Sequence, residues 1–116
     1  MHDVTEGGLA TALEELSIAA EHRIKINMDM IPVLAETRKI CRLLNIQPLG
    51  LIGSGSLLIC CQQTACESLL NSIRQSGVKV TCIGEVLEKG QGIAAFKNGR
   101  PAVWPRFEVD EITQLF

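Results

Sequence analysis

The sequence predicts an α+β domain, an α/β sandwich in which helices pack on one mixed sheet. Helical and strand-like apolar patterns alternate along its 116 residues, and two late strand-like runs flank Asn98-Gly99, a strong hairpin signal. No repeat, linker or low-complexity segment divides the chain. A length in this range is typical of one domain, so residues 1–116 are expected to form a single unit with three main helices and a C-terminal hairpin.

The first two elements are a helix and a strand. From Gly8 to about Ala20, apolar residues recur at helical spacing. The stripe consists of Leu9, Ala12, Leu13, Leu16 and Ala20. Residues 24–28 alternate apolar and polar side chains, which is the period of a half-buried strand.

A second helix and a second strand follow. Pro32 suits a first helical turn, and the helix is expected to end near Asn45. Residues 47–50 are a predicted loop. The Gly-Ser-Gly-Ser sequence at 53–56 leads into residues 57–61, a short apolar run that predicts a central strand.

The third helix is bounded by two clear signals. Thr64 is a predicted N-cap with Glu67 as its capping-box partner, and Gly77 is a natural stop. The expected buried stripe is Cys66, Leu69, Leu70 and Ile73. Residues 78–83 are a predicted strand.

The C-terminal part contains the hairpin and a tail. Residues 93–96 and 102–104 are the predicted hairpin strands, and residues 107–116 suit a short closing helix. Trp104 is expected in the core. The acidic pair Asp110 and Glu111 is expected to be a solvated face.

Composition excludes several classes of function. Eleven Lys and Arg against thirteen Asp and Glu give a formal charge of −2, and no basic stripe is present, so a nucleic-acid partner is not expected. The chain has no apolar leader and no run long enough for a membrane span, so the predicted location is cytoplasmic, without a membrane partner.

The five cysteines favour reduced core thiols over a metal site. They lie in apolar runs, no CxxC pair occurs, and only two histidines are present. A redox or metal module built on these cysteines is the minor alternative.

The first glycine-rich segment, Asp3 to Leu9, has two interpretations. Thr5 could simply cap the helix that follows, or Gly7 and Gly8 could let a ligand approach amides that carry partial positive charge. Asp3 and Glu6 would repel a bare phosphate but would suit one that carries Mg²⁺, or could themselves cap the helix.

The second glycine-rich segment also has two interpretations. Gly53, Ser54 and Gly55 precede a predicted strand rather than a helix, and the segment lacks the Lys of a P-loop. A flexible turn is favoured over a binding loop. His2 and His22 have no Cys or Ser partner at a recognisable spacing, so the sequence contains no self-contained active site.

Several longer stretches resemble a known family. MHDVTEGGLATALEE is followed by IPV, ETR, CRLLNIQPLGLIGSGSLLI and IGEV. These segments resemble the C-terminal domain of the aminoimidazole ribonucleotide (AIR) synthetase, or PurM-like, superfamily. The HypE-like hydrogenase maturation branch is most similar, since it carries an Asp-x-Thr-x-Gly-Gly-Leu motif and a small-residue turn before an apolar strand. The resemblance extends to about Arg106.

The resemblance implies a two-domain, homodimeric parent protein. Its N-terminal domain supplies most ligands of ATP and Mg²⁺ together with the dimer interface, and the C-terminal domain covers the cleft. The residues implied to line the cleft edge, near phosphate or a small-molecule substrate, are Asp3, Thr5, Gly7, Gly8, Gly53, Ser54 and Gly55. The chain is therefore expected to be a fragment cut just before the first motif, with its own N-terminal domain as partner.

Two departures from the HypE-like pattern limit what the resemblance implies. Glu6 stands where HypE usually has Arg, which reverses one phosphate-binding charge. Pro105-Arg106 is present, but the tail runs to Phe116 without the terminal Cys that HypE uses for carbamoyl transfer. What remains is ATP-dependent activation of a substrate oxygen by phosphorylation, with an inactive isolated chain. The alternative is a non-catalytic ligand-binding or interaction module of the same fold.

Overall fold

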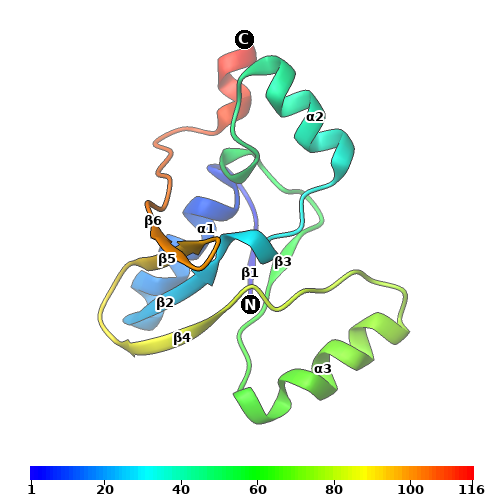
Figure 1. Cartoon of the computed structure of the whole chain (residues 1–116), viewed down its shortest axis with the longest axis vertical. Helices are drawn as coiled ribbons and strands as arrows, with labels where there is room; N and C mark the ends of the chain where they lie inside the picture. The colour runs from blue at the N-terminus through cyan, green and yellow to red at the C-terminus, as the bar shows by residue number, and fades with distance from the viewer.

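A computed structural model describes residues 1–116 (Figure 1). Its strands are β1 (His2–Asp3), β2 (His22–Asn27), β3 (Leu57–Leu58), β4 (Gly84–Lys89), β5 (Ile93–Lys97) and β6 (Arg100–Ala102). Its α-helices are α1 (Gly8–Ala20), α2 (Ala35–Leu44) and α3 (Gln63–Gln75), and its 3-10 helices are η1 (Met28–Met30), η2 (Pro48–Gly50) and η3 (Glu111–Leu115). None of the helices combines the length and the apolar character needed to cross a bilayer.

The main sheet is mixed, which confirms the predicted α+β class. Its four strands follow the order β4-β2-β5-β6, with β2 antiparallel to β4 and parallel to β5, and β5 antiparallel to β6. Ile24 of β2 therefore lies between Val86 and Ile93. The strands β1 and β3 form a separate antiparallel pair.

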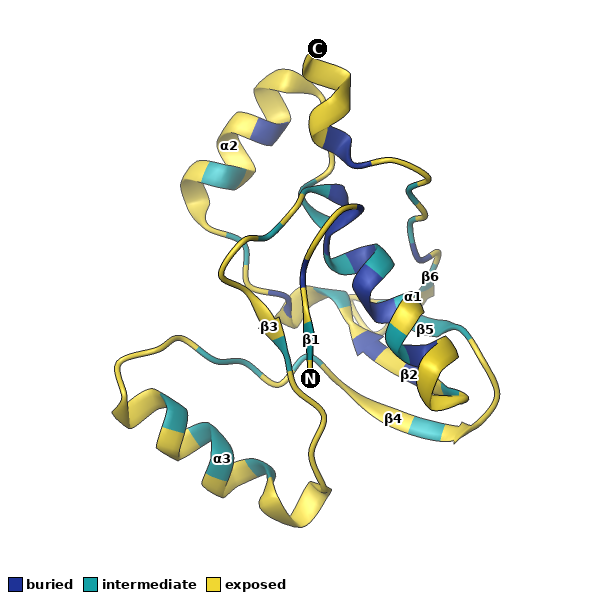
Figure 2. Ribbon diagram, turned by 180° about the vertical axis from the view of Figure 1, so that it is seen from behind, coloured by how far each residue is buried: buried dark blue, intermediate teal, exposed yellow.

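The core lies between α1 and this sheet (Figure 2). Its buried members are Ala10, Leu13, Ile24, Ile26, Ile31, Ala95 and Trp104. Apolar positions of α1 thus meet the alternating Ile residues of β2, as the two sequence periods require. Trp104 is buried as predicted, and its indole N–H donates to the carbonyl of Ala10 at 3.2 Å. That bond holds the chain after β6 against α1.

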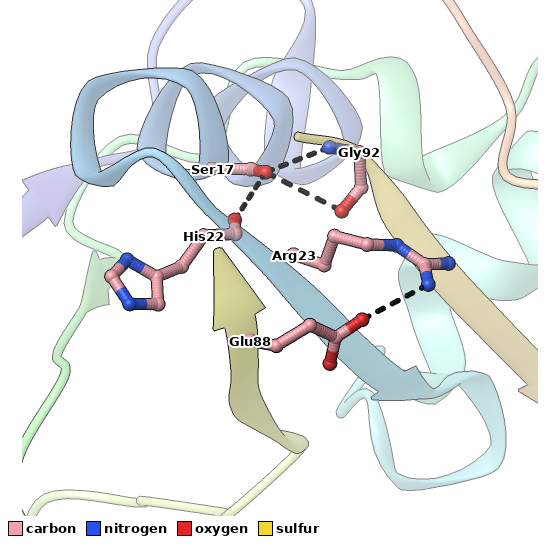
Figure 3. A network of polar contacts seen from close by, with 5 residues as sticks. All are labelled: Ser17, His22, Arg23, Glu88 and Gly92. Carbon is pink, nitrogen blue, oxygen red and sulfur yellow. Dashed lines mark hydrogen bonds and ion pairs between the residues drawn. The ribbon is translucent and has the colours of Figure 1, made fainter. Parts of the chain in front are cut away.

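A buried hydroxyl joins the end of α1 to the sheet (Figure 3). Ser17 is 0% exposed, and its Oγ donates to the carbonyl of His22 at 2.6 Å and accepts from the N–H of Gly92 at 2.9 Å. His22 is the first residue of β2. On the exposed side of the strands, Arg23 pairs with Glu88 at 3.3 Å. Ser17 therefore fixes the start of β2 and the approach to β5 together.

Two predicted strands are wrong in extent. Of residues 57–61, only Leu57–Leu58 are strand, and Leu57 is 54% exposed, because their sole partner is the two-residue strand β1. Residues 78–83 are not strand at all. β2 pairs with β4 only from Gly84 onward. The ladder ends at the bond from the Asn27 N–H to the Ile83 carbonyl at 2.9 Å, so the residues before Ile83 have no partner strand.

Two predicted helix starts also differ. α2 begins at Ala35, and Pro32 stands outside it after an extended Ile31, the conformation that a residue before proline favours. The N-cap of α3 is Gln62 without a side-chain hydrogen bond, so Thr64 lies inside the first turn and does not cap it.

The predicted glycine stop and the hairpin turn are confirmed, but the second hairpin strand is Arg100–Ala102 and does not extend over residues 103–104. Gly77 has φ 82° directly after α3. Asn98 and Gly99 have φ 53° and 73° between β5 and β6, the positive values that a type I′ hairpin turn needs. The short closing helix is present as η3.

Cysteine burial corrects the prediction of core thiols. Cys41 is buried and Cys66 is half-buried, whereas Cys60, Cys61 and Cys82 are exposed. The reason is that the runs containing the last three are not central strands. All five thiols are free, and no group of three His, Cys, Asp or Glu side chains is placed to hold a metal ion.

Candidate functional site

The fold places the two glycine-rich segments side by side. The Val4 carbonyl accepts from the Gly53 N–H at 3.1 Å, and the Val4 N–H donates to the Ser56 carbonyl at 3.4 Å. Asp3 lies opposite Leu57 in the short β1–β3 pair. Val4 is itself buried, so this junction is part of the folded interior. The sequence-predicted residues therefore belong to one continuous edge of the molecule.

The start of α1 is a left-handed glycine pair. Gly7 and Gly8 have φ 81° and 67°, and the Gly8 N–H donates to the Thr5 carbonyl at 3.0 Å. A Cβ on Gly8 would collide with the Leu49 carbonyl, and one on Gly7 would collide with the Thr11 side chain. Both positions thus require glycine for conformation and packing. Thr5 supplies its carbonyl and not its hydroxyl, so the predicted side-chain cap by Thr5 is wrong.

The carboxylate at the start of α1 comes from the far end of the chain. The Gly7 N–H donates to Asp110 Oδ2 at 3.0 Å, while Asp110 Oδ1 accepts from the Ile112 N–H at 3.0 Å. Asp110 is only 6% exposed, so the prediction of a solvated acid is wrong. A carboxylate beside a helix N-terminus is stabilised by the orphan amides and by the helix dipole. Neither Asp3 nor Glu6 takes this place.

Glu111 is buried beside it, and this also corrects the prediction. Its Oε2 accepts from the Gln47 N–H at 2.9 Å, and its Oε1 accepts from the Gln114 side-chain amide at 2.6 Å. Its carboxylate also lies close enough to Cys41 to add to the effect of burial, and the two together raise the pKa of that thiol. The tail therefore places two carboxylates on backbone N–H groups of two other segments.

The capping role of Asp110 could partly be predicted from the sequence. An Asp before a short helical segment is a common N-cap, and Asp110 does cap η3. Its second bond joins residues 103 positions apart, and no local pattern predicts that contact.

A hollow of about 460 Å³ lies between the start of α1 and the tail. Four carboxylate side chains and no basic side chain line it, namely Glu6, Glu15, Glu108 and Asp110. Gly7 is the one predicted site residue that lines it. The others lie along the neighbouring edge, where the Asp3 side chain is 76% exposed and Ser54 and Gly55 form an exposed turn.

His2 lies beside the first loop and contacts two acceptors. Its Nδ1 lies 2.5 Å from the Asp3 carbonyl, and its Nε2 lies 2.8 Å from Glu15 Oε2. Both neighbours are acceptors, so both ring nitrogens are placed to donate. The bond to the Asp3 carbonyl, followed by the interactions with Glu15, raises the pKa of His2 despite partial desolvation.

Comparison with protein families gives a match over most of the chain. Residues 1–97 match the model described as "AIR synthase related protein, C-terminal domain". This range includes both glycine-rich segments and excludes the tail that carries Asp110.

Individual relatives carry hydrogenase maturation names. The chain is 34% identical over 93 residues to the carbamoyl dehydratase HypE of Cupriavidus necator, an alignment that covers 78% of this chain and 26% of that protein. It is 29% identical over 91 residues to the HypE of Escherichia coli, covering 77% of this chain and 27% of that one. The chain thus spans about a quarter of the length of these relatives.

Solved structures agree on the fold. The crystal structure of E. coli HypE, a hydrogenase maturation protein, matches with a TM-score of 0.83 at 25% identity, covering 98% of this chain and 37% of that chain. A HypE in complex with ATP matches with a TM-score of 0.80 at 25% identity, covering 93% and 35%. A HypE–HypF complex matches with a TM-score of 0.81 at 25% identity, covering 90% and 35%.

Proposed function

Because the chain belongs to the family of AIR synthase related C-terminal domains, we propose that it is the C-terminal domain of a two-domain, HypE-like enzyme. This enzyme uses ATP to phosphorylate a substrate oxygen and so makes that oxygen a leaving group. The domain covers the cleft and contributes loops to it. The N-terminal domain supplies most ATP and Mg²⁺ ligands and the homodimer interface, and the enzyme acts in the cytoplasm.

One observation carries this proposal. The two glycine-rich segments, which the family match includes, lie against each other through the backbone of Val4. The edge they form exposes Thr5, Ser54 and Gly55, which are small residues that allow close approach. A similar protein has been solved in complex with ATP, which supports the choice of nucleotide.

The role assigned to this edge is to position the substrate and the phosphate groups for phosphoryl transfer. In phosphoryl transfer the protein mainly orients the reacting groups and stabilises charge on phosphoryl oxygens. Backbone amides and the Thr5 hydroxyl would bind substrate or phosphate oxygens as the cleft closes. This chain brings together no set of cation ligands, so the proposal gives Mg²⁺ to the N-terminal domain.

The size of the native protein tests the two-domain part. An antibody raised against this chain is used on an immunoblot of the source cells. A band well above 12.6 kDa supports the two-domain enzyme. A band at 12.6 kDa contradicts it and favours the alternative, a non-catalytic binding module.

A substitution in the first loop tests the role of the edge. Thr5→Val in the complete protein removes an exposed hydroxyl and keeps the shape of the side chain. ADP release per enzyme is expected to fall by about tenfold or more, since one hydrogen bond to a charged group is lost. Thr64→Val, an exposed Thr on α3, is the matched control. Equal turnover in the two variants would exclude Thr5 from the site.

A further inference from the structure

The C-terminal residues 107–116, here called the strap, fold back onto the start of α1. Figure 1 shows their helix next to α2, at the end of the molecule remote from α3. The strap reaches two different segments, since Asp110 accepts from Gly7 and Glu111 accepts from Gln47. It lies beyond residue 97, where the family match ends.

The Asp110 carboxylate occupies the hydrogen-bonding position at the start of α1. The amide of Gly7 has one hydrogen, and at 3.0 Å the Asp110 carboxylate accepts it. The neighbouring Gly8 amide is used by the Thr5 carbonyl. A phosphate or carboxylate approaching the first glycine pair therefore finds both amides already bonded, one of them to a carboxylate that resembles the ligand itself.

The negative charge of the hollow also opposes the binding of an anion at Gly7. Glu6, Glu15 and Glu108 line it together with Asp110, and no Lys or Arg does. With the strap in place, an incoming anion would face four carboxylates in a partly enclosed space, of which only Glu15 is paired with a basic group, His2. Coulomb repulsion there is stronger than in bulk water. Release of the strap removes Glu108 and Asp110 from this wall and frees the Gly7 amide in one step.

The strap is held mainly by polar contacts. Val109 is 65% exposed and Phe116 is 99% exposed, so these two apolar side chains contribute little burial, whereas Ile112 and Leu115 are partly buried at 40% and 43% exposure. Phe107, which packs against Gly50, is the apolar contact near its base. Hydrogen bonds with a carboxylate can be exchanged for equivalent bonds with a ligand anion, whereas a buried apolar contact cannot.

We propose that the strap is an autoinhibitory element in which Asp110 blocks the first glycine loop until a phosphate-bearing ligand displaces it. The proposal rests on the proposed function in one respect, namely that this loop receives phosphate. The competition itself concerns only the Gly7 amide and does not require catalysis.

The first test compares two acidic residues of the strap in the 116-residue chain. Asp110→Asn and Glu108→Gln remove the same charge, but only Asp110 bonds to Gly7. Pyrophosphate is titrated while the Gly7 amide is followed by NMR, and near-UV circular dichroism of Trp104 reports folding. Asp110→Asn is expected to bind about tenfold more tightly than Glu108→Gln, since a charge-assisted competitor is removed. Equal pyrophosphate affinities of the two variants would contradict the proposal and would leave Asp110 with a helix-capping role alone.

The second test needs no variant and holds even if Asp110→Asn does not fold. Hydrogen exchange of the unmodified chain is measured with and without saturating pyrophosphate. The Gln47 amide, which donates to Glu111 of the docked strap, is expected to lose protection when the anion binds. Anion binding at Gly7 with unchanged protection of the Gln47 amide would overturn the proposal, as would no binding at Gly7 at all. Neither result contradicts the proposed ATP-dependent enzyme, which the immunoblot and the Thr5→Val variant test separately.

Discussion

Gly8 and Gly55 share a left-handed backbone but differ in what surrounds them. Their φ values are 67° and 87°, so a side chain costs each a similar conformational strain. A Cβ on Gly55 would meet open space, whereas one on Gly8 would strike the Leu49 carbonyl. We expect Gly55→Ala to lower the free energy of unfolding by about 1 kcal/mol and Gly8→Ala by about 3 kcal/mol or more. Urea unfolding followed by Trp104 fluorescence measures both, and equal losses would contradict the packing role of Gly8.

A substitution at Gly7 would not separate a loss of function from a loss of folding. A β-branched residue there would combine a positive φ of 81° with a collision against Thr11, so it would disturb folding as well as any ligand. For this reason an exposed side chain of the loop, that of Thr5, is the better probe of function.

Ser17 is a buried polar residue whose removal should be costly. Ser17→Ala leaves the Gly92 N–H without its 2.9 Å acceptor and the His22 carbonyl without its 2.6 Å donor. The expected loss of stability is about 1–3 kcal/mol, the usual cost of unsatisfied buried groups. Ser76→Ala removes an exposed hydroxyl that donates to Ser72 and should cost less than about 0.5 kcal/mol. Thermal unfolding compares the two variants, and a loss for Ser17→Ala as small as that for Ser76→Ala would show that water replaces the hydroxyl.

His2 gives stability a predictable dependence on pH. Its folded-state pKa is raised above 6.5, mainly by the bond to the Asp3 carbonyl and then by Glu15. The protonated ring therefore stabilises the fold fully below pH 6.5, and this contribution is lost as pH rises through the higher folded pKa. Urea midpoints measured across this range should decline for the unmodified chain. The decline should be smaller in Glu15→Gln, and an unchanged decline there would remove Glu15 as a partner of His2.

At the scale of elements, α1 and α3 are equally long but differ in packing. α1 buries Leu13 at 3% exposure, whereas no residue of α3 is buried (Figure 2). Leu13→Ala should cost about 2–5 kcal/mol, as for other core truncations, and Leu70→Ala on α3 less than about 1 kcal/mol. The amides of α3 should also exchange hydrogen faster than those of α1. A Leu70→Ala cost near that of Leu13→Ala would mean that α3 packs more firmly than its exposure indicates.

Elements whose signals are local were predictable from the sequence. α1, β2 and the Asn98-Gly99 hairpin follow from apolar period and from turn chemistry, and Gly77 ends α3 as expected. The strands expected at 57–61 and 78–83 failed because an apolar run becomes a strand only where a neighbour is available to pair. Exposure of Cys60 and Cys61 follows from the same cause.

The candidate site was predictable in part for the same reason. Glycines and small polar residues mark both loops in the sequence, but their contact through Val4 depends on the β1–β3 pairing. Asp110 and Glu111 look like surface acids because the groups that satisfy them, on Gly7 and Gln47, are far away in the sequence. Long-range partners of charged groups are set by the whole fold.

At the scale of the whole molecule, the isolated chain should not bind nucleotide well. The amides of Gly7 and Gly8 are already bonded, four acids line the adjoining hollow, and no cluster of cation ligands is present. If Kd exceeds the ligand concentration, binding adds less than about 0.4 kcal/mol, which shifts Tm by no more than about 3 °C in a domain of this size. Thermal unfolding of the 116-residue chain with 1 mM ATP–Mg²⁺, roughly the substrate range of many enzymes, should therefore show a shift within that limit. A larger shift would mean that this domain holds the nucleotide without an N-terminal partner, and the stand-alone binding module would then be the better account of its role.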